Sequence, residues 1–162
     1  MLITSEILLI HLMDLSISLF GQPDRVLASV ECHGGVVKNG DTLTAQVKFE
    51  NGCTASLNAF THTPFFSRLA VFGSDGWAEI RDKAHVQAPE GWFFTTCFKD
   101  GKAETMEYEV ATPVLSNLEC FADAVAGTGS YPNTPEQIVR NVSLLEAIVK
   151  STASDEIVRV ER

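Results

Sequence analysis

The chain has 162 residues, of which 45% are hydrophobic and 20% charged, so we expect one folded domain, residues 1–162, with a real core. Twelve basic against 21 acidic residues give a net charge of -9. This balance argues against nucleic-acid binding, because phosphates are neutralised by Lys and Arg, and against docking on an anionic membrane. A small solute or a second copy of the chain is the expected partner.

The N-terminal 20 residues are apolar but do not have the pattern of a signal peptide or a membrane span. No basic residue precedes the apolar run, and polar residues interrupt it at Glu6, His11 and Asp14. Leucines recur at helical spacing, at Leu8, Leu9, Leu12, Leu15 and Leu19. We therefore expect an amphipathic helix that begins at Ser5, a possible N-cap residue, and ends at Gly21.

The central part of the chain, from Arg25 to Val110, alternates apolar and polar residues. A period of two is typical of a sheet with one buried face. Three dipeptides tolerate the positive φ of tight turns: Asn51-Gly52, Asp75-Gly76 and Asp100-Gly101. The pattern predicts a strand over residues 25–35 followed by hairpins over residues 42–60, 68–82 and 92–110.

Helical spacing returns after Val110. Thr112-Pro113 and Thr134-Pro135 each place a capping hydroxyl before a proline, and Gln137 completes a capping box. The expected core-facing residues of these two helices are Leu115, Leu118, Ala122 and Val125, then Ile138, Val142, Leu145 and Val149. Residues 157–160 predict a short closing strand. The fold class is therefore α+β, an open and mostly antiparallel sheet with helices packed on one face.

Cysteines are few and scattered, at Cys32, Cys53, Cys97 and Cys120, without a C-x-x-C pair. This spacing favours a reduced, cytoplasmic chain whose cysteines serve as small core hydrophobes.

Motifs of known chemistry are absent for the most part. Gly127-Thr128-Gly129 starts like a dinucleotide fingerprint, but Pro132 replaces the third glycine and the stretch follows a helix, so we expect a plain loop. The spacing of the four histidines predicts no metal site. His11 and Asp14 lie one helical turn apart, and an imidazole there can exchange a proton near neutral pH. The residues alone leave a structural histidine as the other interpretation.

Five segments in order resemble the C-terminal domain of the Gfo/Idh/MocA oxidoreductases, which include glucose–fructose oxidoreductase and inositol dehydrogenase. The segments are Ile10–Leu15 with Leu19–Pro23, Asp41–Gly52, Leu69–Gly76, Phe121–Gly127 and Thr134–Ala147. The resemblance covers nearly the whole chain, from His11 to Val160. It implies a C-terminal domain with an open sheet. Such a domain is similar to the C-terminal domains of dihydrodipicolinate reductase and glyceraldehyde-3-phosphate dehydrogenase.

The resemblance also implies a role for this domain. In that family a separate Rossmann domain binds NAD or NADP, and the C-terminal domain supplies the substrate pocket and the oligomer contact. His11 matches the catalytic histidine that handles the proton as hydride leaves a sugar or polyol carbon, and Asp14 matches an acidic residue near the substrate. Ile7 stands where the family often has an aspartate. Without the Rossmann domain, this chain is expected neither to bind the nucleotide nor to be active alone as a CH-OH dehydrogenase.

Two further substrate-binding candidates flank the connection over residues 60–68, namely His62 and Arg68. An arginine can clamp a carboxylate or hydroxyl groups, although an ordinary solvated connection is the alternative. The aromatic run Trp92-Phe93-Phe94 can cover a pocket or, as we expect, pack in the core or an interface.

A second function class is a non-catalytic, self-associating or ligand-binding module derived from the same family. The expected outer sheet face is polar but almost uncharged, and interface cores are depleted of charge. Its residues are Thr42, Thr44, Gln46, Thr54, Ser56 and Asn58, with Lys48 as the exception. Two copies are expected to pack through this face as a homodimer or within a tetramer.

Overall fold

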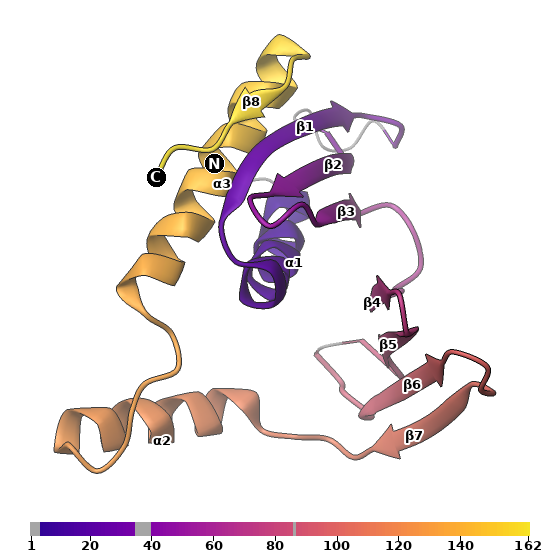
Figure 1. The fold of residues 1–162 in the computed structure, drawn as a ribbon, viewed down its shortest axis with the longest axis vertical. Coiled ribbons are helices and arrows are strands. Elements are labelled where there is room, and N and C mark those ends of the chain that lie inside the picture. The colour runs from indigo at the N-terminus through magenta and orange to yellow at the C-terminus, as the bar shows by residue number, and fades with distance from the viewer. Residues whose placement is uncertain (1–3, 35–39, 86) are drawn as a thin grey trace. The chain divides into compact units, whose positions relative to one another are not determined.

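The computed structural model describes residues 4–34, 40–85 and 87–162, with side chains from Leu9 onward. The elements, in chain order, are α1 (Thr4–Phe20), β1 (Pro23–Glu31), β2 (Thr42–Phe49), β3 (Thr54–Phe60), β4 (Arg68–Gly73), β5 (Gly76–Asp82), β6 (Trp92–Phe98), β7 (Glu104–Tyr108), α2 (Pro113–Ala126), α3 (Pro135–Ser154) and β8 (Val158–Arg159) (Figure 1). This order confirms the predicted helix, hairpins, two helices and closing strand, and the α+β class. The N-cap predicted at Ser5 lies outside the described side chains.

The strands form two four-stranded antiparallel sheets, whereas the sequence pattern was interpreted as one. The first sheet has the order β3-β2-β1-β8 and the second β4-β5-β6-β7. The chain divides into two compact units, the first made of Met1–His62 with Pro132–Arg162 and the second of Thr63–Tyr131. Each unit holds one sheet. The single domain over residues 1–162 stays a prediction.

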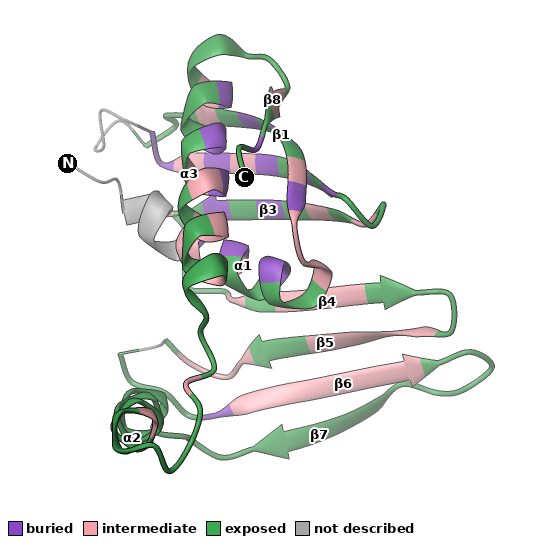
Figure 2. Cartoon of the chain, turned by 60° about the vertical axis from the view of Figure 1, so that its left-hand side comes forward, coloured by how far each residue is buried: buried purple, intermediate pink, exposed green. Residues whose placement is uncertain are grey.

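The hydrophobic core lies in the first unit, between one face of its sheet and the helices α1 and α3. Alternate residues of β2 are buried, as the period of two predicts. In Figure 2 the buried positions gather on α1, α3 and the strands of this sheet. The core comprises Leu9, Met13, Ile17, Val26, Ala28, Leu43, Ala45, Val47, Phe49, Leu57, Leu144, Ala147, Ile148 and Val160.

The predicted core faces of α1 and α3 are correct in part, since Leu9 is buried and Leu12 and Leu145 pack against the core, but both faces are rotated from the observed ones. On α1, Leu15 and Leu19 are 43% and 50% exposed, and the buried positions are Leu9, Met13, Ser16 and Ile17. On α3, Ile138, Val142 and Val149 are exposed, and the buried positions are Leu144, Ala147, Ile148 and Ser151. Both helices carry more than one apolar stripe, and helical periodicity alone does not tell which stripe meets the sheet.

Helix α2 has no buried residue among its 14, so its predicted apolar stripe is exposed. The exposed residues include Leu115, Leu118 and Val125. Pro113 begins the helix as predicted, but the Thr112 hydroxyl makes no capping bond, since the residue has φ -110° and ψ 70°. Helix α3, by contrast, has the predicted capping box, in which Thr134 and Gln137 bond reciprocally.

Two smaller predictions also change. Strand β1 ends at Glu31 and not at residue 35, because the backbone N–H groups of His33 and Gly34 donate to the Asp41 carboxylate and not to a strand ladder. Residue 35 itself lies outside the described residues. The prediction that the cysteines serve as core hydrophobes is correct in part: Cys53 is half-buried and packs against the core, Cys97 is half-buried in the second unit, and Cys32 and Cys120 are exposed.

A matched pair of leucine substitutions tests where the core lies. Leu144 is 0% exposed, so Leu144→Ala is expected to lower the free energy of unfolding by about 2–5 kcal/mol through lost burial and an internal cavity. Leu118 on α2 is 62% exposed, so Leu118→Ala is expected to change it by less than about 0.5 kcal/mol. Urea unfolding followed by circular dichroism measures both. Equal losses would mean that the α2 stripe is covered in solution.

Candidate functional site

Helix α1 presents His11 and Asp14 on its exposed side. Because Leu9, Met13 and Ile17 face the sheet, the helical period turns positions 11 and 14 away from it. The two side chains lie one turn apart on a common face. No hydrogen bond or ion pair joins them within the described part of the chain, so the imidazole of His11 is open to a ligand.

Asp14 is held by a residue that sequence reasoning did not single out. Asn141 on α3 donates from Nδ2 to Asp14 Oδ1 over 2.8 Å and to the Gln137 carbonyl over 3.3 Å. Its Oδ1 is buried and has no hydrogen-bond partner among the described residues. Nothing in the neighbouring residues signals this role, because it depends on which turn of α3 meets α1. The bond ties the Asp14 carboxylate on α1 to α3.

His62 takes part in a structural cluster around the loop between β1 and β2. The His33 N–H donates to Asp41 over 3.0 Å, and the Gly34 N–H donates to the same carboxylate. The His62 ring lies against Gly34, since a Cβ added there would be 2.7 Å from His62 Cδ2. The contacts of His62 therefore lie with this loop, and its substrate-binding role stays a prediction.

Asp41 is 1% exposed, and hydrogen bonds stabilise its charged form. The N–H groups of His33 and Gly34 are the main causes that hold the pKa of Asp41 below its ordinary value of 3.8, with smaller contributions from Thr42 and His62. Burial acts in the opposite direction. Asp41 thus ties the end of β1 to the start of β2.

Arg68 belongs to the second unit, and its contacts lie there. Its side chain is 58% exposed, with Nη1 3.5 Å from Glu79 Oε2 and the guanidinium 6.0 Å from the centre of the Phe66 ring. The exposed guanidinium leaves donors for a carboxylate or hydroxyls, as the predicted role requires. The aromatic run that follows is half-buried: Trp92, Phe93 and Phe94 all lie in β6, with Phe94 against Tyr108.

The Gly127–Gly129 stretch does not fit a dinucleotide pyrophosphate. Gly127 ends α2 with φ 74° and its N–H bonds to the Ala124 carbonyl. The N–H groups of Thr128 and Gly129 both donate to the Asp123 carbonyl. These three donors complete the helix C-terminus and are not directed at a ligand. The interpretation of this stretch as a loop is therefore correct.

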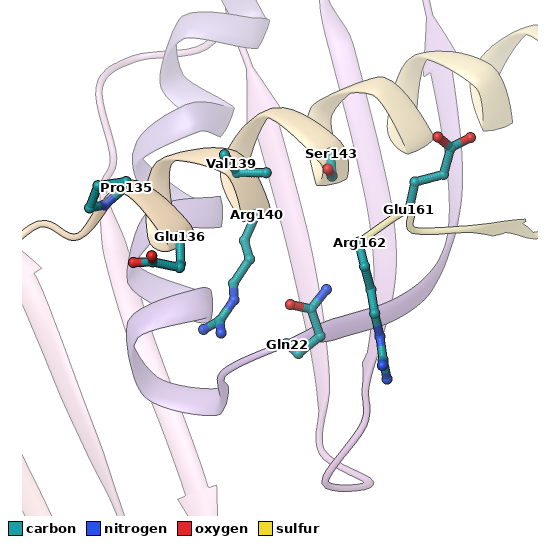
Figure 3. A pocket seen from close by; sticks show the side chains of 8 residues that line it. All are labelled: Gln22, Pro135, Glu136, Val139, Arg140, Ser143, Glu161 and Arg162. Atoms are coloured by element: carbon teal, nitrogen blue, oxygen red, sulfur yellow. The ribbon is translucent and has the colours of Figure 1, made fainter.

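A groove of about 390 Å³ lies in the first unit, and its lining includes none of the predicted site residues. Figure 3 shows side chains from α3, from Gln22 and from the C-terminal residues Glu161 and Arg162 around it. Its charges are balanced: Arg162 pairs with Glu50, and Arg140 lies near Glu136. The pKa of Glu136 is lowered mainly by its own backbone N–H and by Thr134, with a smaller effect of Arg140. A balanced, open groove offers little to an ion.

No group of three or more His, Cys, Asp or Glu side chains among the described residues is arranged to hold a metal ion. None of the helices, within the same residues, combines the length and the apolar character needed to cross a bilayer.

Comparison with known proteins gives one sequence match and many structural ones. Residues 7–79 match the family model described as the GFO/IDH/MocA C-terminal domain. No curated protein sequence matches the chain. An aldose–aldose oxidoreductase from Caulobacter crescentus, complexed with glycerol, has a similar fold with a TM-score of 0.79 at 18% identity, over 93% of this chain and 45% of that one. The resemblance to the GFO/IDH/MocA C-terminal domain is confirmed.

A second solved structure agrees. An oxidoreductase from Agrobacterium radiobacter, in complex with NAD+, L-tartaric acid and magnesium, gives a TM-score of 0.72 at 17% identity, over 93% of this chain and 47% of that one. The chain therefore spans about half the length of the solved structures it matches. At such identities the similarity shows the fold, and the family match covers most of α1, the strands β1 to β4 and most of β5.

The pH dependence of stability tests the Asp41 cluster. Because folding lowers the pKa of Asp41, its contribution is complete above 3.8 and is lost as the pH falls through the lowered folded value. Asp41→Asn is therefore expected to be less stable than the parent chain at pH 7, with a gap that closes in acid below 3.8. Urea unfolding at pH 7 and in acid measures this gap. Asp75→Asn, in the exposed turn between β4 and β5, is the control and should show no such gap.

Proposed function

We propose that this chain is the substrate-binding and oligomerisation domain of an NAD(P)-dependent dehydrogenase acting on a sugar, a cyclitol or a related polyol. The carrying observation is the presentation of His11 and Asp14 on the exposed side of α1, with Asp14 held by Asn141. The other interpretation is a buried structural histidine. The exposed position of His11 argues against it. The Caulobacter protein, an aldose–aldose oxidoreductase complexed with glycerol, supports a polyol-like substrate.

His11 is assigned the proton transfer. Oxidation of an alcohol carbon releases a hydride and the hydroxyl proton, and an imidazole suits the second task because it titrates near neutral pH. Asp14 accepts a hydrogen bond from a neighbouring substrate hydroxyl with the carboxylate oxygen that Asn141 leaves open. In this proposal His62 remains a secondary substrate contact, and Arg68 stays a separate candidate in the second unit. In this proposal the substrate is a dissolved molecule that reaches the site from water. The protein is proposed to be cytoplasmic.

The nicotinamide cofactor is assigned to another part of the enzyme. The Agrobacterium protein holds NAD+ in a chain of which the matched fold covers 47%. In this chain the Gly127–Gly129 donors are used by α2. We therefore propose that this chain alone neither binds NAD(P) nor transfers hydride.

A titration with polyols tests the proposal. The chain is titrated with an aldose and a linear polyol, and the histidine ring signals are followed by NMR. We expect weak, saturable binding, on the order of millimolar, that shifts the His11 signals. His11→Ala should weaken binding at least about tenfold, the loss of about 1.4 kcal/mol. His85→Ala, an exposed histidine of the second unit, is the matched control. Equal effects of the two substitutions would refute the assignment.

A second candidate function is self-association through the outer face of the first sheet. The β2 and β3 part of this face is mostly uncharged and internally hydrogen-bonded: Ser29 of β1 and Thr44 share a bond of 2.9 Å, and Gln46 donates to Ser56 over 2.7 Å. Charged side chains on the same face are Lys48 on β2, Arg25 and Glu31 on β1, and Arg159 on β8. Leu27, opposite Gln46, is 43% exposed on the same face. Side chains that already satisfy one another lose less on desolvation, which favours a protein contact. The two functions are compatible within one protein.

Light scattering tests the second candidate. The chain is expected to form a dimer that buries at least about 1,000 Å² in total. Ser56→Lys places a charge on this face, opposite Gln46, and should raise the dissociation constant about tenfold or more. Ala153→Lys on the exposed side of α3 is the control and should have no effect. A strict monomer at high micromolar concentration would contradict the proposal.

A further inference from the structure

A cluster of cations and aromatic rings lies on one face of the second sheet. Arg68, Arg81, Phe93 and Glu107 are successive partners across β4, β5, β6 and β7, so their side chains share a face. Lys83, just after β5, joins them, with its Nζ 5.2 Å from the centre of the Phe93 ring. We call Arg68, Arg81, Lys83 and Phe93 the Arg81 cluster.

The positive charges of the cluster exceed the carboxylates that neutralise them. Glu79 is 3.5 Å from Arg68, and Glu107 is 3.0 Å from Lys83. Arg81 has no carboxylate at ion-pair distance among the described residues, and its guanidinium lies 5.2 Å from the centre of the Phe93 ring. The chain as a whole carries a net charge of -9, so a local excess of positive charge runs against its composition.

This arrangement costs stability unless an anion is present. Arg68 and Arg81 are direct cross-strand partners, and like charges in that position destabilise a sheet. Arg81 and Lys83 also approach the same ring, so their charges repel each other. Contact with the Phe93 ring explains the position of one cation on this face but not of two. The Arg81 guanidinium lies over the Phe93 ring and makes no side-chain hydrogen bond among the described residues, so its N–H groups can match the two oxygens of a carboxylate or phosphate.

We propose that Arg81, with Arg68 and Lys83, binds the oxyanion group, carboxylate or phosphate, of a small solute. Arg81 supplies the bidentate contact, Arg68 a second guanidinium beside it, and Lys83 a nearby positive charge. The inference goes beyond the proposed function and does not rest on it. Binding of the oxyanion itself depends on the second unit alone.

The test is a titration of the full chain with succinate and, separately, inorganic phosphate at constant ionic strength. Butane-1,4-diol serves as the neutral counterpart of succinate. We expect saturable binding of at least one of the two anions, no binding of the diol, and NMR shifts at Arg81. Arg81→Gln should weaken binding about tenfold or more, because it removes the bidentate charged contact. Arg159→Gln is the matched control, since that side chain is 84% exposed in the first unit.

Thermal unfolding provides a second test. It gives a result that contact between Arg81 and the Phe93 ring alone would not explain. Without anion, Arg81→Gln should unfold at the same temperature as the parent chain or higher, because a like-charge pair is removed. With anion, the unfolding temperature should rise for the parent chain and not for the variant. Binding of succinate alone assigns a carboxylate, and binding of phosphate alone assigns a phosphate group.

Three outcomes would overturn the inference. They are no saturable binding of either anion, equal weakening by Arg81→Gln and Arg159→Gln, and a lower unfolding temperature of Arg81→Gln without anion. A further outcome would also overturn it. If Arg81→Gln dissociates a dimer while succinate has no effect, the cluster is a protein contact. His11→Ala should leave anion binding unchanged, so its result separates this inference from the proposed function.

Discussion

The packing of α1 and α3 against one face of the β3-β2-β1-β8 sheet governs the rest of the first unit. Leu9, Met13 and Ile17 fix the rotation of α1, and with it the outward direction of His11 and Asp14. Ser151 ties α3 to β1, since its hydroxyl accepts the Ala28 N–H over 2.9 Å and donates to the Glu156 carbonyl over 2.6 Å. The same docking brings Asn141 to Asp14. The candidate site is thus a consequence of how the core is filled.

Local chemistry explains why so much of the fold follows from the sequence. Asn51-Gly52 and Asp100-Gly101 specify tight turns within a few residues of themselves, and Gly52 and Asp100 do have positive φ, at 89° and 64°. The capping box of Thr134 and Gln137 is equally local. The rotation of each helix is not local, because it depends on which stripe fits a sheet formed by distant residues. Thr112 shows the same limit: its hydroxyl suits a cap, but its backbone angles prevent the bond.

The candidate site residues also differ in whether local sequence can predict them. The spacing of His11 and Asp14 on one helix is visible in the sequence, and the resemblance to a known family gives it meaning. Asn141 and Arg81 carry no such signal. Asn141 matters because α3 meets α1 at that turn, and Arg81 because the strand register sets it opposite Arg68. The family match over residues 7–79 stops before α2 and α3, so beyond that point the fold alone carries the similarity.

The absence of a buried apolar side chain from the described residues of the second unit has a consequence for its dynamics. Its strands are held by ladder hydrogen bonds and by surface contacts such as Phe94 with Tyr108. Segments with few buried contacts open locally at low cost, so backbone amides of residues 63–131 should exchange with deuterium sooner than those of β1 and β2. A molecule that binds there would then order the strands as it binds. The free energy needed for that ordering would lower its affinity.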